Sequence, residues 1–267
     1  MGVHNATPDS FSDGGDYKSI GKEIEHCCLM LDEGADIIDI GGESTNPNDS
    51  SSVLSSDDEL ARIIPIIRGV KKIRPESVIS VDTFKADVAY EAVTNGADIV
   101  NDVSGLKYSE NMGDVVAKTG AYLVLMHMKF LPKSKNEFRE SDNIIYEVKT
   151  SLSECVEKAL KCGVNLSKII IDPGIGGGCF GKNTNENIQL LSSISELKKM
   201  NCPILIGASR KGFIGEILGE SNPKKRINGN LAVASWCFMN NVDILRVHDV
   251  QQTRQLLKIL EVLRNIN

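Results

Sequence analysis

Short apolar runs alternate with amphipathic stretches along the whole chain, and this alternation restricts the fold more than any other feature. The runs are rich in Ile and Val, which is typical of strands buried on both faces. We predict strands at residues 2–5, 37–40, 79–81, 99–101, 122–126, 169–171, 204–207 and 244–247. We predict helices at residues 22–33, 57–72, 86–94, 112–118, 143–162, 187–200, 231–240 and 251–265.

This strand–helix order implies that the strands pair in parallel. Eight repeats favour an α/β barrel, the (β/α)8 or TIM barrel, over an open doubly wound sheet, which stays the alternative at this point. The chain has 267 residues, close to the ~250 residues typical of such a barrel. The long polar stretches at residues 46–56 and 129–142 are interpreted as loops, so we expect a single domain over residues 1–267.

Composition and charge exclude several classes of protein. The net charge is −6 and there is no basic stripe, which argues against a nucleic-acid partner. No stretch reaches the ~18 consecutive apolar residues of a membrane helix, and the first residues do not form a signal peptide. The seven cysteines include no C-x-x-C pair, so we interpret them as reduced thiols of a cytoplasmic protein.

Polar side chains follow most of the predicted strands. In a parallel barrel the carboxyl ends of all strands meet at one face, where the active sites of this fold lie. Asp82 and Asp172 offer carboxylates there, and Asn101 and Lys211 add hydrogen-bond donors. A flat heterocycle with N–H groups along one edge matches paired acceptors of this kind.

Arg246 and His248 lie just before the last predicted helix. A helix N-terminus beside two such side chains is suited to an anion. Asp249 and Asp102 have a simpler interpretation as helix N-caps. The sequence therefore predicts a barrel enzyme that holds a polar heterocycle in its mouth and an anion near the last helix.

Two further polar residues have competing interpretations. His127, between two methionines, is interpreted as a packed, hydrogen-bonded histidine rather than a base. Glu43 is either a general base or a bridge between strands at the barrel rim, and we favour the bridge. The sequence contains no H-x-x-x-H or paired C-x-x-C metal motif and no G-x-S-x-G elbow.

Eight segments of the chain resemble, in order, the motifs of the dihydropteroate synthase family, and the match covers essentially the whole chain. They are NATPDSFSDGG (5–15), DIIDIGGEST (36–45), SVDTFKADVA (80–89), DIVNDVSGL (98–106), LMHM (125–128), IIIDPGIG (169–176), GASRKGFIG (207–215) and ILRVHDV (244–250).

The resemblance implies substrates and site residues. Members of the family condense 6-hydroxymethyl-7,8-dihydropterin pyrophosphate with p-aminobenzoate to give 7,8-dihydropteroate and pyrophosphate in folate biosynthesis. The positions that match the pterin pocket are Asp82, Asn101, Met126, Asp172, Phe180 and Lys211. Those that match the pyrophosphate site are Asn5, Arg246 and His248. Those that match the p-aminobenzoate site, which sulfonamides occupy, are Phe11, Thr45, Pro47 and Ser209.

The resemblance also implies a mechanism, a cofactor and an assembly. Pyrophosphate leaves first, and the amine of p-aminobenzoate captures the cationic pterin methylene. Mg2+ acts with Asn5 on the leaving group, and the protein is a homodimer. The residues implied in catalysis are Asn5, Asp82, Asp172, Lys211, Arg246 and His248.

The chain departs from the family pattern at three places. Asn46 stands where the family has an anion-contacting Arg, and the segment from Asp172 to Lys182 is three residues longer than usual, which is expected to displace Phe180. Relatives usually have a segment before the first strand, so this chain is either trimmed or one domain of a fused folate enzyme. These departures keep open a pterin-binding homologue with weak or no synthase activity. A methyltetrahydrofolate methyltransferase is a weaker alternative.

Overall fold

The strands of the computed structural model form one closed ring. The model describes residues 1–6, 17–43, 53–130 and 139–265. Six strands pair in parallel in sequence order: β1 (Gly2–Asn5), β2 (Ile37–Gly41), β3 (Val78–Asp82), β4 (Ile99–Asp102), β5 (Tyr122–Met126) and β6 (Ile169–Asp172). A second parallel pair is formed by β7 (Leu205–Ile206) and β8 (Ile244–Leu245).

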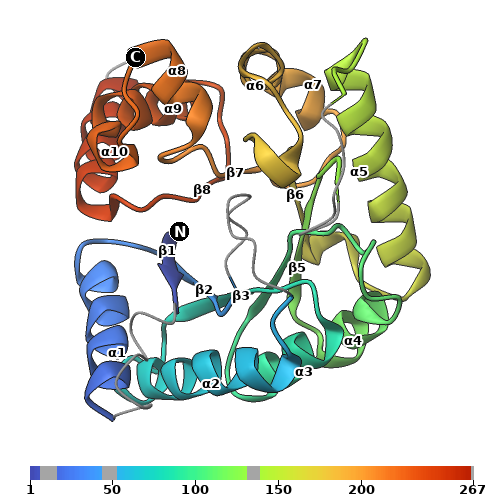
Figure 1. The fold of residues 1–267 in the computed structure, drawn as a ribbon, viewed down its shortest axis with the longest axis vertical. Helices are drawn as coiled ribbons and strands as arrows, with labels where there is room; N and C mark the ends of the chain where they lie inside the picture. Colours follow the sequence, from blue (N-terminus) through green and yellow to red (C-terminus); the bar gives the residue numbers. More distant parts are fainter. Residues whose placement is uncertain (7–16, 44–52, 131–138, 266–267) are drawn as a thin grey trace.

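Two isolated parallel bridges join the two sheets. Ile171 pairs with Ile204, and Gly2 pairs with Val247. The first bridge connects β6 to β7 and the second connects β8 back to β1, so the barrel is complete (Figure 1). The predicted barrel is confirmed and the open sheet is excluded. Figure 1 also shows the helices as an outer ring around the strands.

The helices follow the predicted order with one break and one addition. They are α1 (Tyr17–Asp32), α2 (Ser56–Ile73), α3 (Ala86–Thr94), α4 (Met112–Thr119), α5 (Ile144–Lys161), α6 (Thr184–Ser192), α7 (Ile194–Lys198), α8 (Gly212–Leu218), α9 (Ile227–Met239) and α10 (Val250–Arg264). The single helix predicted over residues 187–200 is wrong. It begins at Thr184, behind a capping box of Asn183 and Glu186, and breaks at Ser193. Helix α8 was not predicted, because two glycines lower the helix propensity of its seven residues.

The core has two layers with different partners. Inside the barrel one apolar layer takes a side chain from each strand or its start: Met1, Ile37, Val78, Ile99, Val124, Ile170, Leu205 and Ile244. Alternate residues such as Ile38 and Ile40 point outward and pack in the larger core between strands and helices. The layer inside the barrel forms a floor, so polar residues closer to the carboxyl ends lie above it. In the described part of the chain, no helix is long and apolar enough to cross a membrane.

Candidate active site

The strand register brings predicted site residues to one level at the mouth of the barrel. Asn5 pairs with Gly41, Gly41 with Asp82, and Asp82 with Asn101. The side chains of Asn5, Asp82 and Asn101 therefore lie at the same height on the barrel wall. Asn5 is exposed, whereas Asn101 is only 3% exposed.

Arg246, from the end of β8, reaches across this level to two carboxylates. Its Nε donates to Oδ2 of Asp39 over 2.5 Å, and its Nη2 donates to Oδ2 of Asp82 over 2.6 Å. The Nδ2 of Asn101 donates to the same oxygen of Asp39 over 3.2 Å. Asp39 was missed by sequence reasoning. The sequence feature that could have identified Asp39 is a carboxylate inside an otherwise apolar strand, at a position that points into the barrel.

These ion pairs set the protonation of the cluster. Burial, with the negative charges of Asp39 and Glu59, raises the pKa of Asp82 to about 7, although the Arg246 guanidinium opposes the shift. The neighbouring carboxylates of Asp39 and Asp82 raise the pKa of Arg246 despite its burial. Arg246 therefore stays charged, and Asp82 is poised to gain or lose a proton near neutral pH.

Asp172 lies at the end of β6, paired in register with Met126 of β5. It is 5% exposed, and its Oδ1 accepts a hydrogen bond from the backbone N–H of Gly174 over 2.7 Å. Burial raises the pKa of Asp172 to about 6, against that hydrogen bond and the positive charges of Lys211, Arg246 and Lys182. A carboxylate held at one oxygen can offer the other to a ligand.

The long segment from Asp172 to Lys182 folds back on itself. The backbone N–H of Lys182 donates to the carbonyl of Gly176, so the extra residues form a short turn, η3 (Gly178–Phe180). Phe180 lies under Lys211, whose Nζ is 3.6 Å from the ring centroid. The structure thus brings these two predicted pterin residues together.

Lys182 was also missed, and it holds this segment to the barrel. Its Nζ is buried and donates to the carbonyls of Gly174 (2.8 Å), Phe180 (3.1 Å) and His127 (3.4 Å). Burial lowers the pKa of Lys182 to about 7. Gly174 is required at this point, because a side chain there would lie 1.9 Å from the carbonyl oxygen of His127.

The predicted anion residues follow β8, which pairs with β7, the strand before the Lys211 turn. The Oγ of Ser209 lies 3.2 Å from Nδ1 of His248 and accepts from the His248 backbone N–H over 3.3 Å. Burial and the nearby Arg210 and Arg246 lower the pKa of His248 to about 4. His248 is therefore neutral at pH 7 and is available to bind through a ring N–H or a lone pair.

The competing interpretations of other polar residues are resolved. Asp249 precedes α10 but makes no capping hydrogen bond, and it pairs with Arg210 over 2.6 Å. Asp102 accepts from the backbone of Ser104 and Leu106 rather than capping a helix. The N-cap interpretation is thus wrong for Asp102. Asp249 does occupy the N-cap position of α10, but its carboxylate binds Arg210 instead of the helix backbone.

The expected structural role of Glu43 agrees with the geometry, and that of His127 agrees in part. His127 is packed at 2% exposed, and burial lowers its pKa to about 2. Its ring is not hydrogen-bonded as predicted, because the buried Nδ1 has no partner among the described residues and Nε2 lies 3.7 Å from Glu147. Glu43 accepts from Lys85 over 2.7 Å and from the backbone N–H of Leu54 over 3.0 Å. Lys85 also donates to Glu59 over 2.5 Å, so Glu43 belongs to a buried ion cluster at the barrel rim.

Part of the predicted site falls outside the described residues. Phe11, Thr45 and Pro47, predicted at the p-aminobenzoate site, lie there together with Asn46. Among the described residues, no group of three or more His, Cys, Asp and Glu side chains is placed to hold a metal ion.

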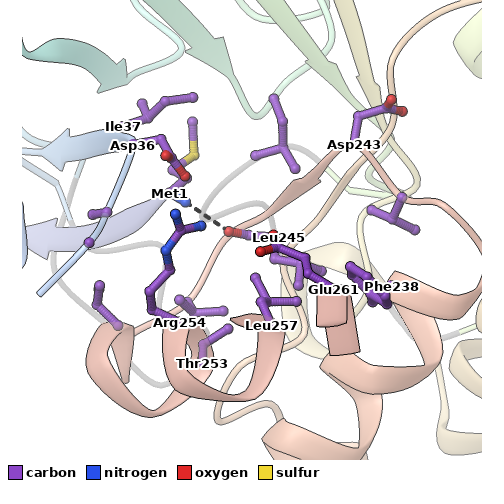
Figure 2. Close-up of a pocket in the computed structure, with 16 residues that line it drawn as sticks. Met1, Asp36, Ile37, Phe238, Asp243, Leu245, Thr253, Arg254, Leu257 and Glu261 are labelled. Atoms are coloured by element: carbon purple, nitrogen blue, oxygen red, sulfur yellow. Dashed lines mark hydrogen bonds between the residues drawn. The ribbon is translucent and has the colours of Figure 1, made fainter. Parts of the chain in front are cut away.

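A cavity of about 420 Å³ opens at the opposite end of the barrel. Met1, Ile37 and Asp243 line it from the amino ends of the strands, and Arg254 and Glu261 line it from α10 (Figure 2). It shares no lining residue with the predicted site, so it is separate from the mouth described above.

Comparison with known proteins gives one consistent family. A family model described as pterin binding enzyme matches residues 1–248. A dihydropteroate synthase of Synechocystis sp. is 40% identical over 263 residues, which cover 98% of this chain and 89% of the relative.

Solved structures agree with this result. A dihydropteroate synthase from Clostridium difficile, determined in the presence of pteroic acid, has a TM-score of 0.88 and 42% identity, covering 98% of this chain and 95% of that one. The enzyme from Xanthomonas albilineans with 4-aminobenzoic acid has a TM-score of 0.89 and 37% identity, covering 99% of this chain and 92% of that one.

Proposed function

The chain belongs to the family of pterin-binding enzymes, and from this premise we propose that it is a dihydropteroate synthase of folate biosynthesis. It condenses 6-hydroxymethyl-7,8-dihydropterin pyrophosphate with p-aminobenzoate. The bond from the pterin methylene to the diphosphate oxygen breaks, a bond to the amine nitrogen forms, and the amine loses a proton. The observation that carries the proposal is the ring of Asp82, Asn101, Asp172, Lys211 and Arg246 in one barrel mouth.

The pterin is held by complementary hydrogen bonds. The free oxygen of Asp172 accepts from the N–H edge of the ring, with Asn101 close by as donor and acceptor. Lys211 donates to the carbonyl side of the ring, and Phe180 and Met126 provide apolar contact. A carboxylate accepting from neutral N–H groups makes stronger hydrogen bonds than a neutral acceptor does.

The charge of the mouth favours departure of the diphosphate. Asp39, Asp82 and Asp172 surround Arg246, so carboxylates lie near the carbon that becomes cationic. His248 takes the diphosphate at the start of α10, and Ser209, whose Oγ lies beside the His248 ring, lines the adjoining p-aminobenzoate site. Because His248 is neutral in the free protein, binding of this anion is expected to raise the His248 pKa and draw in a proton.

Asn5 is suited to a Mg2+ ion that arrives with the diphosphate. Mg2+ prefers oxygen ligands and is commonly held by one or two protein groups together with substrate phosphates. Asn5 is exposed at the end of β1, so its amide oxygen is accessible to an ion that arrives with the diphosphate. When bound, the ion supplies positive charge that stabilises the leaving diphosphate.

A homodimer is supported by exposed apolar side chains on the neighbouring helices α8 and α9. Trp236 and Met239 of α9 are 45% and 69% exposed, and Ile217 of α8 is 59% exposed. The Nε1 of Trp236 donates to the carbonyl of Leu191, which joins α9 to α6. A contiguous apolar surface on these helices would suit a protein–protein contact. The six cysteines whose side chains are described are free thiols, which supports a reducing, cytoplasmic location.

The test is release of pyrophosphate from dihydropterin pyrophosphate with Mg2+, with and without p-aminobenzoate. Release that depends on p-aminobenzoate and yields dihydropteroate supports the synthase. Tight pterin binding without turnover would refute synthase activity and favour a pterin-binding homologue.

A further inference from the structure

The turn that carries Lys211 has a backbone conformation that must be held in place. Arg210 has a φ of +63°, in the left-handed region. Residues other than glycine rarely adopt this conformation, because Cβ crowds the following carbonyl. Lys211 comes next and is the N-cap of α8. If Arg210 relaxes, the direction of Lys211 changes.

Arg226, at the start of α9, holds this turn. The residue is 8% exposed, and its guanidinium donates to four backbone carbonyls. Two belong to the turn: Nη1 donates to Arg210 over 2.8 Å and to Lys211 over 3.2 Å. The other two lie after α8: Nε donates to Glu220 over 3.0 Å and Nη2 to Ser221 over 2.8 Å. The planar fork of an arginine suits four fixed acceptors, which the single ammonium of a lysine cannot all reach.

Helix α8 is shaped to admit this guanidinium. A side chain at Gly215 would lie 2.5 Å from Nε of Arg226, 2.6 Å from its Cζ and 2.5 Å from the carbonyl oxygen of Glu220, which accepts from that Nε. Any larger residue at Gly215 must therefore displace the guanidinium or a carbonyl that it binds. The glycine therefore leaves room for Arg226 against the helix that begins at Gly212, directly after Lys211.

The same turn is tied to the anion residues. Asn230, one helical turn after Arg226, accepts from the Arg210 backbone N–H over 2.9 Å and donates to Asp249 over 3.2 Å. Asp249 accepts from the Arg210 side chain and follows His248. The start of α9 thus joins the Lys211 turn to the segment that carries His248.

We propose that Arg226 is a positioning residue that, through the carbonyls of Arg210 and Lys211 and the space left by Gly215, fixes Lys211 for pterin binding. This role rests on the proposed function for the identity of the ligand. Arg226 acts through the backbone, so it sets the direction of Lys211 without touching the substrate.

The experiment compares Arg226→Lys and Gly215→Ala with wild type. Arg226→Lys keeps the positive charge but removes the planar guanidinium that donates to several carbonyls. Gly215→Ala keeps Arg226 but places a methyl group where its guanidinium lies. Arg254→Lys on α10 and Gly21→Ala on α1 are matched controls, since a side chain at Gly21 would meet nothing within 4 Å. Binding of pteroic acid is measured by calorimetry at a temperature where circular dichroism shows each protein folded.

We expect Arg226→Lys and Gly215→Ala to weaken pteroic acid binding roughly tenfold to a hundredfold, the effect of losing the hydrogen bond from the charged Lys211 to the pterin. The two controls bind as wild type does. Folded variants that bind pteroic acid within twofold of wild type would overturn the proposal, even if they melt at lower temperature. If one variant does not fold, the other decides. Wild type that binds pteroic acid without turnover would refute synthase activity and leave this test intact, because it measures binding.

Discussion

Replacing Asp172 by Asn tests the central contact of the proposed pterin site. The structure determines how the new amide must turn. The backbone N–H of Gly174 donates to Oδ1 of Asp172 over 2.7 Å in a buried setting, so the amide oxygen of the substituted side chain keeps that place. The NH2 group then takes the position of the second carboxylate oxygen, and a donor meets the N–H edge of the pterin.

The size of the effect follows from the lost hydrogen bond. A hydrogen bond to a charged group contributes about 1.5–3 kcal/mol. Since ~1.4 kcal/mol is a factor of ten in a binding constant, pterin affinity should fall roughly tenfold to 150-fold. In Asp172→Asn the new NH2 group also faces an N–H group of the pterin, and this contact between two donors weakens binding further. We therefore expect a loss of affinity in the upper half of the range.

Calorimetric titration with pteroic acid at pH 8 measures this loss, because Asp172 is ionised there in wild type. Asp243→Asn is the matched control. Asp243 also accepts from one backbone N–H, that of Ile204 over 2.8 Å, but lies at the other end of the barrel. An Asp172→Asn protein that keeps its affinity within twofold would show that Asp172 does not hold the pterin.

Three further predictions concern protonation, the loop and assembly. Burial raises the folded-state pKa of Asp82 from 3.8 to about 7, so the unfolded chain loses this proton first. The free energy of unfolding should therefore fall as pH rises from ~4 to 7, and urea titrations of Asp82→Asn should lack that part of the fall. Lys182→Met leaves three carbonyls without their donor and should lower the free energy of unfolding by roughly 2–3 kcal/mol. It should also shift the pH midpoint of pteroic acid binding upward, because Lys182 lowers the pKa of Asp172; an unmoved midpoint contradicts this. Met239→Asp should convert the proposed dimer to monomer in sedimentation, whereas Ile259→Asp on α10, at a side chain 62% exposed, should not.

The barrel could be predicted because its signals are local. Each strand is an apolar run bounded by polar residues or glycine. The run and its boundaries lie within a few residues of one another in the sequence. The ends of β7 and β8 show the limit of this reasoning. Strands were predicted over residues 204–207 and 244–247, but the regular strands are two residues long. Ile204 and Val247 instead form the bridges that close the ring, and bridges depend on strands far away in the sequence.

The site residues were predictable where they end a strand and not where their role depends on a distant partner. Asp82, Asn101 and Asp172 follow apolar runs, so their place at the mouth follows from the parallel order. Lys182 was missed, since it acts on carbonyls as far away as His127, 55 residues earlier. A lysine after a glycine-rich segment has no local feature that distinguishes a buried support from a solvated side chain.

Arg246 shows why charge balance must be taken from the assembled barrel. The family resemblance predicts that Arg246 contacts the diphosphate. In the structure its guanidinium donates to two carboxylates, those of Asp82 and of Asp39, which is 207 residues away in the sequence. Three carboxylates, those of Asp39, Asp82 and Asp172, act on Arg246, and the positive charges of Lys211 and Lys182 also act on Asp172. Above pH 7 the carboxylates are ionised and Lys182, whose pKa is about 7, loses its proton, so the mouth then carries an excess of negative charge before substrate binds. A neutral pterin is tolerated in that field, whereas a pterin methylene that becomes cationic is attracted by it. In the proposed reaction, this arrangement favours loss of diphosphate before the amine attacks. It arises from pairings between strands that the sequence does not place side by side.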